Sequence, residues 1–291
     1  MKRIHLLEVL FDNLNALLML AIVLIIAYPF LYVFLYSISD PAHLKAGLML
    51  WPERFTLNSY KVIFANPVIL NGVYISIARS VLGTLTMLLV TAAAAYAISK
   101  QYLIGVRFLR VFFILTMYFS GGIIPAYLLV KSLGLTNNFM VYIIPNMVSV
   151  FNMILIRTFV ESIPASLEES ALMVGANELQ IFLYIIIPMS TPVLAAVGLF
   201  TFVNQWNSFV DVQIYNFMKP ELYPLQYILY NYLMSQAQSV EQAKRSLNVT
   251  AISPQSLKTT ITIITILPIF FIYPVLQKYF VSGLMIGSIK E

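Results

Sequence analysis

The sequence has no cysteine and only two histidines among its 291 residues. Without cysteine the chain forms no disulfide and offers no thiolate nucleophile or cysteine-ligated metal. His5 and His43 are isolated, so they form no metal-ligand motif. Charged residues make up only 10% of the chain, against about a quarter in soluble domains. With 60% hydrophobic residues, this composition indicates an integral membrane protein.

Most of the apolar residues lie in almost uncharged runs of the roughly 20 residues that a helix needs to cross a bilayer. Six runs predict transmembrane helices: Leu14–Ser37, Leu70–Ile98, Val111–Val130, Phe139–Phe159, Met189–Val210 and Thr259–Tyr279. They are continuously apolar, whereas the strands of a membrane β-barrel alternate between apolar and polar residues. The predicted fold class is therefore all-α, a polytopic membrane protein with six transmembrane helices.

Two other apolar segments need separate interpretation. The run Tyr223–Met234 is too short to span a membrane, and its leucines recur at helical spacing, so we expect an interfacial or docked helix. Lys2 and Arg3 precede the first span, as they would in a signal peptide. The apolar core that follows is too long for one and has no small-residue cleavage site, so the first span is expected to be retained.

The charges say little about partners or orientation. The net charge of +5 includes no dense Lys/Arg cluster, so no nucleic acid is expected as a partner. Lys and Arg are equally numerous on the two sides of the six-span arrangement, and the positive-inside rule therefore leaves the orientation open. The loop Lys100–Arg110 carries the densest basic patch beside the span ends, which favours cytoplasmic termini.

The composition of the spans predicts how they pack. Proline removes a helical hydrogen bond and bends a helix, which membrane proteins tolerate where neighbours or water satisfy the freed carbonyl. Such kinks suit a gated pathway, and irregular packing explains any single proline equally well. The span prolines are Pro29, Pro125, Pro145, Pro192, Pro268 and Pro274.

Small residues between Gly83 and Ser99 predict that the second span lies inside the helix bundle.

Residues 164–188, which we call the elbow, form a polar turn between two apolar segments. Ser166 and Glu169 have the spacing of a capping box, and Gly175 is well placed as a left-handed helix stop. We expect one short helix over Leu167–Val174 and a second that begins near Asn177 and continues to the fifth span. The elbow is too polar to insert into lipid and too apolar on one face to remain free, so it requires a partner surface.

The spacing of the elbow resembles the EAA loop of ABC importer permeases. That loop reads Glu-Ala-Ala, three residues, Gly, nine residues, Ile, one residue, Leu-Pro. Here it is matched by Glu169, Ser170, Ala171, Gly175, Ile185, Ile187 and Pro188, with Ser for the first Ala and Ile for the Leu. The segments Ala95–Lys100, Trp206–Phe209 and Tyr279–Lys290 are similar to the second permease of maltose-type carbohydrate importers. Residues 121–135 are similar to a branch that handles polysaccharide fragments.

This resemblance implies a type I ABC importer permease fold with three regions. Residues 1–68 would hold an N-terminal transmembrane helix and the first extracellular loop. Residues 69–281 would form the core transmembrane domain with its coupling loop at 164–188, and residues 282–291 a cytoplasmic tail. The protein would be a multi-pass component of the bacterial cytoplasmic membrane with both termini in the cytoplasm.

The resemblance also implies a function and partners. The chain would move a carbohydrate, an oligosaccharide or polysaccharide fragment, by alternating access together with a second homologous permease. Two copies of a cytoplasmic ATPase and an extracellular solute-binding protein complete such importers in the lipid bilayer. The residues implied in ATPase coupling are Glu168, Glu169, Ser170, Ala171, Gly175 and Ala176. The chain would be non-catalytic and bind no cofactor, because it has no Gly-x-x-x-x-Gly-Lys-Ser/Thr motif, and ATP and Mg would belong to the partner ATPase.

Several residues are candidates for the substrate pathway. Amides, a carboxylate and an aromatic face suit sugar hydroxyls and C–H surfaces, and the fifth span supplies them at its end as Asn204, Gln205, Trp206, Asn207 and Asp211. A tryptophan near a membrane boundary is also a common anchor in the aromatic belt. Arg79 lies inside the second span, where it lines a cavity, forms a structural ion pair or extends its charge to the interface.

A secondary transporter and a polytopic membrane enzyme are the alternative functions. The first would place carboxylates or histidines within the spans for ion coupling, and the six spans contain neither. The second would need an acid-base set, and only the elbow is acidic. Its adjacent Glu168 and Glu169 would point about 100° apart on a helix.

Overall fold

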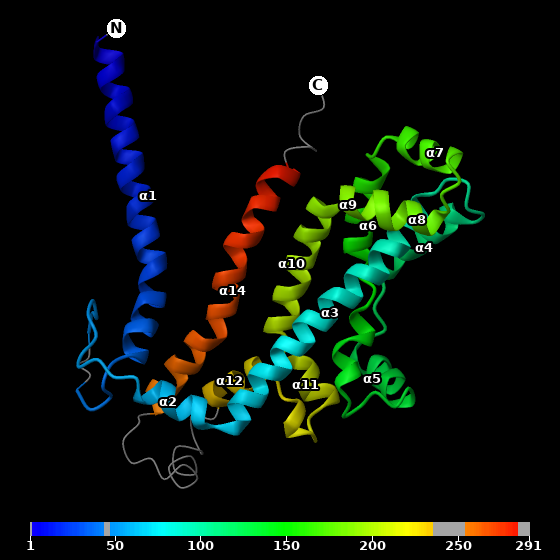
Figure 1. Ribbon diagram of the computed structural model, residues 1–291. Coiled ribbons are helices and arrows are strands. Elements are labelled where there is room, and N and C mark those ends of the chain that lie inside the picture. Colours follow the sequence, from blue (N-terminus) through cyan, green and yellow to red (C-terminus); the bar gives the residue numbers. More distant parts are fainter. Residues whose placement is uncertain (1, 44–46, 235–253, 285–291) are drawn as a thin grey trace. The chain divides into compact units, whose positions relative to one another are not determined.

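The computed structural model describes residues 2–43, 47–234 and 254–284, and these are almost entirely helical (Figure 1). The α-helices are α1 (Lys2–Ser37), α2 (Asn58–Ala65), α3 (Pro67–Ser99), α4 (Val106–Tyr118), α5 (Ile123–Ser132), α6 (Val150–Glu161), α7 (Ala165–Met173), α8 (Glu178–Ile181), α9 (Ile187–Met189), α10 (Thr191–Asn207), α11 (Val210–Tyr215), α12 (Leu225–Met234) and α14 (Pro254–Leu284). The irregular helices are η1 (Phe139–Tyr142), η2 (Ile144–Asn146), η3 (Phe182–Ile186) and η4 (Pro220–Leu222), of which η3 is a π-helix. Within the described residues the only extended pairing is an isolated bridge between Ser39 and Phe55. The predicted all-α class is confirmed.

The chain forms two compact units. One comprises Met1–Pro67 with Asn231–Leu267, and the other comprises Val68–Tyr230 with Pro268–Glu291. In the first unit, the apolar side chains along Leu10–Ile26 of α1 are largely exposed, as a lipid-facing helix requires. The second unit contains the elbow and the candidate pathway residues.

Three helices and three bent helix pairs in the described chain are long and apolar enough to cross a membrane. The continuous ones are Leu10–Ser37, Pro67–Ser99 and Gln255–Ile272. The bent pairs are Val106–Tyr118 with Ile123–Ser132 at 117°, Phe139–Asn146 with Val150–Glu161 at 46°, and Glu178–Met189 with Thr191–Asn207 at 79°. Six spans are therefore accounted for, and the third, fourth and fifth are bent sharply at a break in the helix.

The breaks have local causes that the hydropathy pattern does not reveal. The third span stops at Tyr118 and restarts after Gly122, whose φ of 86° ends helical geometry. Pro145 lies in a first-turn position of η2, and Pro192 in the first turn of α10, where a missing N–H costs nothing. Pro29 lies inside the unbroken α1. Prolines in this chain therefore begin helices at least as often as they bend them.

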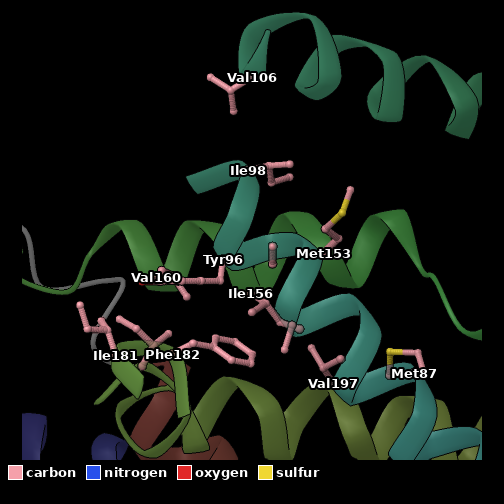
Figure 2. Close-up of a cluster of buried hydrophobic side chains, with 13 residues drawn as sticks. Met87, Tyr96, Ile98, Val106, Met153, Ile156, Val160, Ile181, Phe182 and Val197 are labelled. Atoms are coloured by element: carbon pink, nitrogen blue, oxygen red, sulfur yellow. The ribbon is translucent and has the colours of Figure 1, made fainter. Parts of the chain in front are cut away.

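The core of the second unit forms where α3 meets α6, the second half of the elbow and α10 (Figure 2). It contains Met87, Ala92, Ala95, Tyr96, Ile98, Val106, Met153, Ile156, Val160, Ile181, Phe182, Ile186 and Val197. The alanines of α3 let its neighbours approach closely, and Ala95 is fully buried. The prediction that the second span lies inside the bundle is confirmed.

The short helix α12 is docked, as predicted. It begins at Leu225, directly after Pro224, and the Leu225 N–H donates to the Ser76 hydroxyl of α3 at 2.8 Å. Leu225 and Leu229 are buried. A Cβ added at Gly72 of α3 would lie 2.4 Å from the Ile228 side chain, so the missing side chain of Gly72 makes room for α12.

Candidate functional site: the acidic elbow and the buried arginine

The elbow consists of two helical segments joined at a glycine. Helix α7 ends at Met173, and the N–H of Ala176 then returns to the carbonyl of Ala171 at 3.0 Å. Gly175 has a φ of 90°, which only glycine adopts freely, as the sequence predicts. The second segment begins after Asn177, also as predicted, and continues through α8, the π-helix η3 and α9.

The capping box predicted for the first elbow helix is wrong. Helix α7 begins at Ala165, two residues earlier than expected, and Pro164 occupies the cap position. Ser166 is therefore inside the helix, and its carbonyl accepts a hydrogen bond from the Ser170 hydroxyl at 2.7 Å. The capping box instead joins Asn177 and Gln180, each side-chain oxygen accepting from the other's N–H at 2.9 Å. The Asn-x-x-Gln spacing was the available signal.

The three carboxylates of the elbow have different surroundings. Glu168 forms an ion pair with Lys100, which follows α3. Glu178 accepts hydrogen bonds from the hydroxyls of Tyr96 at 2.7 Å and Tyr102 at 2.6 Å. The hydrogen bond to this carboxylate raises the pKa of Tyr102 to about 12. Glu169 is exposed and contacts no other charged group in the described chain.

The remaining coupling candidates divide between the interior and the surface. Ala171 and Ala176 pack against the core cluster, whereas Ser170 is exposed. Beside Glu169, the tip of the elbow presents Met173 and Val174 with exposed fractions of 88% and 90%. Next to this tip is an open hollow lined by Val174, Gly175, Ala176, Gln180, Ile181, Tyr184 and Ile185. The roles of the coupling candidates stay predictions.

Arg79 is fully buried in α3, and its guanidinium makes five hydrogen bonds. Two reach the Gln205 side-chain oxygen at 3.1 and 3.3 Å, one reaches the Ser208 carbonyl at 3.2 Å, and two reach the carboxylate of Asp211. The group also lies 4.2 Å from the centre of the Tyr142 ring. A buried guanidinium must hydrogen-bond its N–H groups and needs a nearby negative charge. The surroundings of Arg79 provide both, as in a structural ion pair.

The other pathway candidates lie in different surroundings on α10. Asn204 and Asn207 are exposed, while Trp206 is 1% exposed and stacks on Phe202 with ring centres 6.4 Å apart. Of the six candidate pathway residues, the structure brings Arg79 into contact with Gln205 and Asp211. The sequence interpretation missed Tyr142, whose carbonyl accepts from Gln205 at 3.1 Å, because nothing in a hydropathy pattern pairs the fourth span with the fifth. A substrate role for any of these residues stays a prediction.

Residues 102–286, well over half of the chain, match the family described as binding-protein-dependent transport system inner membrane component. The chain belongs to this family. Protein LplC of Bacillus subtilis (strain 168) is 36% identical over 282 residues, 96% of this chain and 95% of LplC. The polygalacturonan/rhamnogalacturonan transport system permease protein YtcP of the same strain is 32% identical, over 97% of this chain and 98% of YtcP.

A solved structure gives the same result for the fold. It is the crystal structure of a bacterial ABC transporter involved in the import of the acidic polysaccharide alginate. The likeness has a TM-score of 0.86 and 31% identity, and it covers 94% of this chain and 97% of that chain. The resemblance to ABC importer permeases is thus confirmed, and the protein is a multi-pass membrane component of a transport system. The family match includes the whole elbow and Asp211, whereas Arg79 and Lys100 precede it.

Proposed function

We propose that this permease is one transmembrane subunit of an ATP-driven carbohydrate importer, and that the elbow seats in a cytoplasmic ATPase subunit. The outward face of the elbow is the observation that carries the proposal. It combines an exposed carboxylate, Glu169, with the highly exposed Met173 and Val174. Each large apolar side chain left in water forgoes about 1.5–3 kcal/mol of burial free energy. Such a patch at the tip of a rigid loop is typical of a protein interface.

The rest of the complex follows from this assignment. Docking of the elbow to a cytoplasmic ATPase puts the elbow, and with it both termini, on the cytoplasmic side. A second homologous permease completes the membrane part, and two ATPase copies supply the energy from ATP and Mg, which this non-catalytic chain does not bind. The family description, binding-protein-dependent transport, supports an extracellular solute-binding protein as the source of substrate.

The substrate class rests on the relatives. YtcP is named for polygalacturonan and rhamnogalacturonan transport, and the alginate transporter imports another acidic polysaccharide. We infer that this permease carries fragments of a carbohydrate polymer by alternating access. Asn204 and Asn207 on the exposed side of α10 are the side chains best suited to bind sugar hydroxyls. The secondary transporter and the membrane enzyme have no observation in their favour.

Copurification and uptake test the proposal together. The full chain, tagged at one end and expressed in its native host, should bring down an ATPase and a second permease from solubilised membranes. Deletion of the gene should abolish uptake of at least one labelled oligosaccharide among galacturonan, rhamnogalacturonan, alginate and arabinan fragments. Uptake that continues with a proton gradient and no ATP would instead favour a secondary transporter. A chain that copurifies with neither subunit would overturn the assignment.

A further inference from the structure

The cytoplasmic end of α3, under the proposed orientation, holds both helical segments of the elbow. Lys100, the first residue after α3, pairs with Glu168 on α7. Tyr96 in the last turn of α3 and Tyr102 in the loop that follows both donate to Glu178 on α8. These contacts reach the elbow on either side of its turn at Gly175. In Figure 1 both α7 and α8 lie at this end of α3.

The contacts form one continuous cluster, which we call the clamp: Tyr96, Lys100, Tyr102, Glu168 and Glu178. The two oxygens of Glu178 are both used, one by each tyrosine hydroxyl. The Lys100 ammonium lies 4.1 Å from the centre of the Tyr96 ring while it bonds Glu168. The Tyr96 ring also packs on Phe182 of the elbow with ring centres 5.3 Å apart, a contact within the core drawn in Figure 2. Attachment at two points prevents the elbow from turning about a single contact.

The end of α3 is itself fixed to two further helices. Arg110 of α4 donates to the carbonyl of Ile98 at 2.6 and 2.8 Å and to that of Ser99 at 3.1 Å. A cation at this position satisfies carbonyls that the helix leaves unpaired and favours the negative end of its dipole. Arg110 also bonds Glu161 of α6, which Arg157 holds at 2.8 Å. The clamp is therefore attached to a braced helix end.

We propose that Tyr96, Lys100 and Tyr102 are positioning residues that make the elbow and α3 move as one body. This inference rests on the proposed docking to an ATPase. Movement imposed on the elbow would then pass into α3, whose Arg79 is bonded to α10 and to Asp211 of α11. The proposal also gives the three elbow carboxylates different roles. Glu168 and Glu178 bond residues of this chain, and Glu169 faces the ATPase.

Because the chain has no cysteine, introduced cysteines can be spin-labelled without interference. One label replaces Met173 at the tip of α7, and a second replaces Tyr74, which is 68% exposed on the distal half of α3. At a rise of about 1.5 Å per residue, α3 separates the two by a span of about 35 Å or more, within the range of pulsed EPR. The distance distribution is measured in the full chain in nanodiscs, and in the assembled complex before and after trapping with ATP and vanadate.

The clamp predicts a narrow distribution that stays at the same distance when the complex is trapped. A triple variant should broaden this distance distribution: Lys100→Met, Tyr96→Phe and Tyr102→Phe. These changes keep the aliphatic stem and both rings but remove the hydrogen bonds and the ion pair to the elbow. Arg107→Met, which removes an exposed cation from the same region, is the matched control and should leave it unchanged. A distance that shifts on trapping, or clamp variants that remain as narrow as the wild type, would overturn the proposal.

A charge swap separates the clamp from docking. Lys100→Glu and Glu168→Lys should each broaden the distribution, and the two together should restore most of it because the attraction is symmetric. If Glu168 instead contacted the ATPase, Glu168→Lys would reduce the amount of ATPase that copurifies. Adding Lys100→Glu would then not restore that amount. The nanodisc measurement needs no partner, so a failure of ATPase copurification would contradict the proposed function while the clamp could still be judged.

Discussion

Arg79 shows how a single buried charge is made tolerable in a membrane-spanning helix. Its partners come from three helical elements besides its own, and they consist of a carboxylate, an amide, a carbonyl and an aromatic face. Such a pair contributes little to stability by comparison with apolar packing, but the loss of one member leaves the other charge exposed to a low dielectric. The arrangement therefore attaches α3 to the junction between α10 and α11.

We expect Asp211→Leu to lower the free energy of unfolding by about 3–5 kcal/mol, because it leaves the Arg79 charge buried without its counter-ion. The double variant Arg79→Met with Asp211→Leu should recover much of that loss. Thermal unfolding of the purified full chain in detergent measures both. If the single variant were as stable as the wild type, Arg79 would have to reach water, as a cavity-lining residue does.

Gly175 determines the angle between the two parts of the elbow. An added Cβ would meet nothing within 4 Å, so the cost of a side chain there is backbone strain alone, about 1–2 kcal/mol for a left-handed residue. Gly175→Val should therefore reduce uptake more than expression. Gly175→Asn is the control and should retain most uptake, since Asn tolerates this conformation. Equal uptake by the Val variant would show that the turn does not need a positive φ.

At the scale of helices, the sequence predicts those features that a single residue determines locally. It does not predict features that depend on contacts between two distant segments. Gly175 and the spacing to Asn177 predicted the turn and the start of the second elbow helix. The capping box predicted at Ser166 is wrong, because the helix begins upstream of it, directly after Pro164. The hydropathy of Val111–Val130 could not reveal the break at Gly122, since apolar residues lie on both sides of it. The bonds from Tyr102 to Glu178 and from Arg79 to Asp211 join residues far apart in the chain, and no local pattern predicts them.

The contact between α3 and α10 depends on two glycines with different surroundings. A Cβ at Gly83 would lie 2.8 Å from the Gln205 amide nitrogen, so Gly83→Ala should displace Gln205 from Arg79. A Cβ at Gly198 would meet the flexible end of Leu88 at 3.2 Å, which can move. We expect the Gly83 variant to lose about 1–3 kcal/mol of stability and the Gly198 variant less. Equal losses in thermal unfolding would mean that Gln205 is not held in place.

Trp206 and Asn207 are neighbours on α10 with opposite exposure, and they allow packing to be separated from substrate binding. Trp206→Ala should cost about 3–5 kcal/mol and reduce assembly and ATPase activity together, because its side chain is buried. Asn207→Ala should lower uptake while the ATPase still copurifies. The measurements are subunit recovery and oligosaccharide uptake in membrane vesicles. Loss of uptake with full assembly in the Trp206 variant would identify that ring as a sugar contact.

At the scale of the whole molecule, six spans are accounted for, and a cluster of contacts ties the elbow to the end of α3. The predicted regions 1–68, 69–281 and 282–291 remain predictions, and most of the last one lies outside the described residues. The central claim is that the tip of the elbow faces a cytoplasmic ATPase. The proposals about energy transfer, orientation and the role of Glu169 depend on it.

Site-specific crosslinking tests that claim most directly. Met173→Cys and Met218→Cys introduce the same change at two exposed methionines, one at the elbow tip and one after α11. In intact cells, Met218→Cys should react with a membrane-impermeant maleimide while Met173→Cys should be protected. In membranes containing the assembled complex, a short bifunctional crosslinker at Met173→Cys should capture the ATPase, and the added change Glu169→Lys should reduce the yield. Labelling of Met173→Cys from outside the cell, or crosslinks from it only to the extracellular solute-binding protein, would contradict the account.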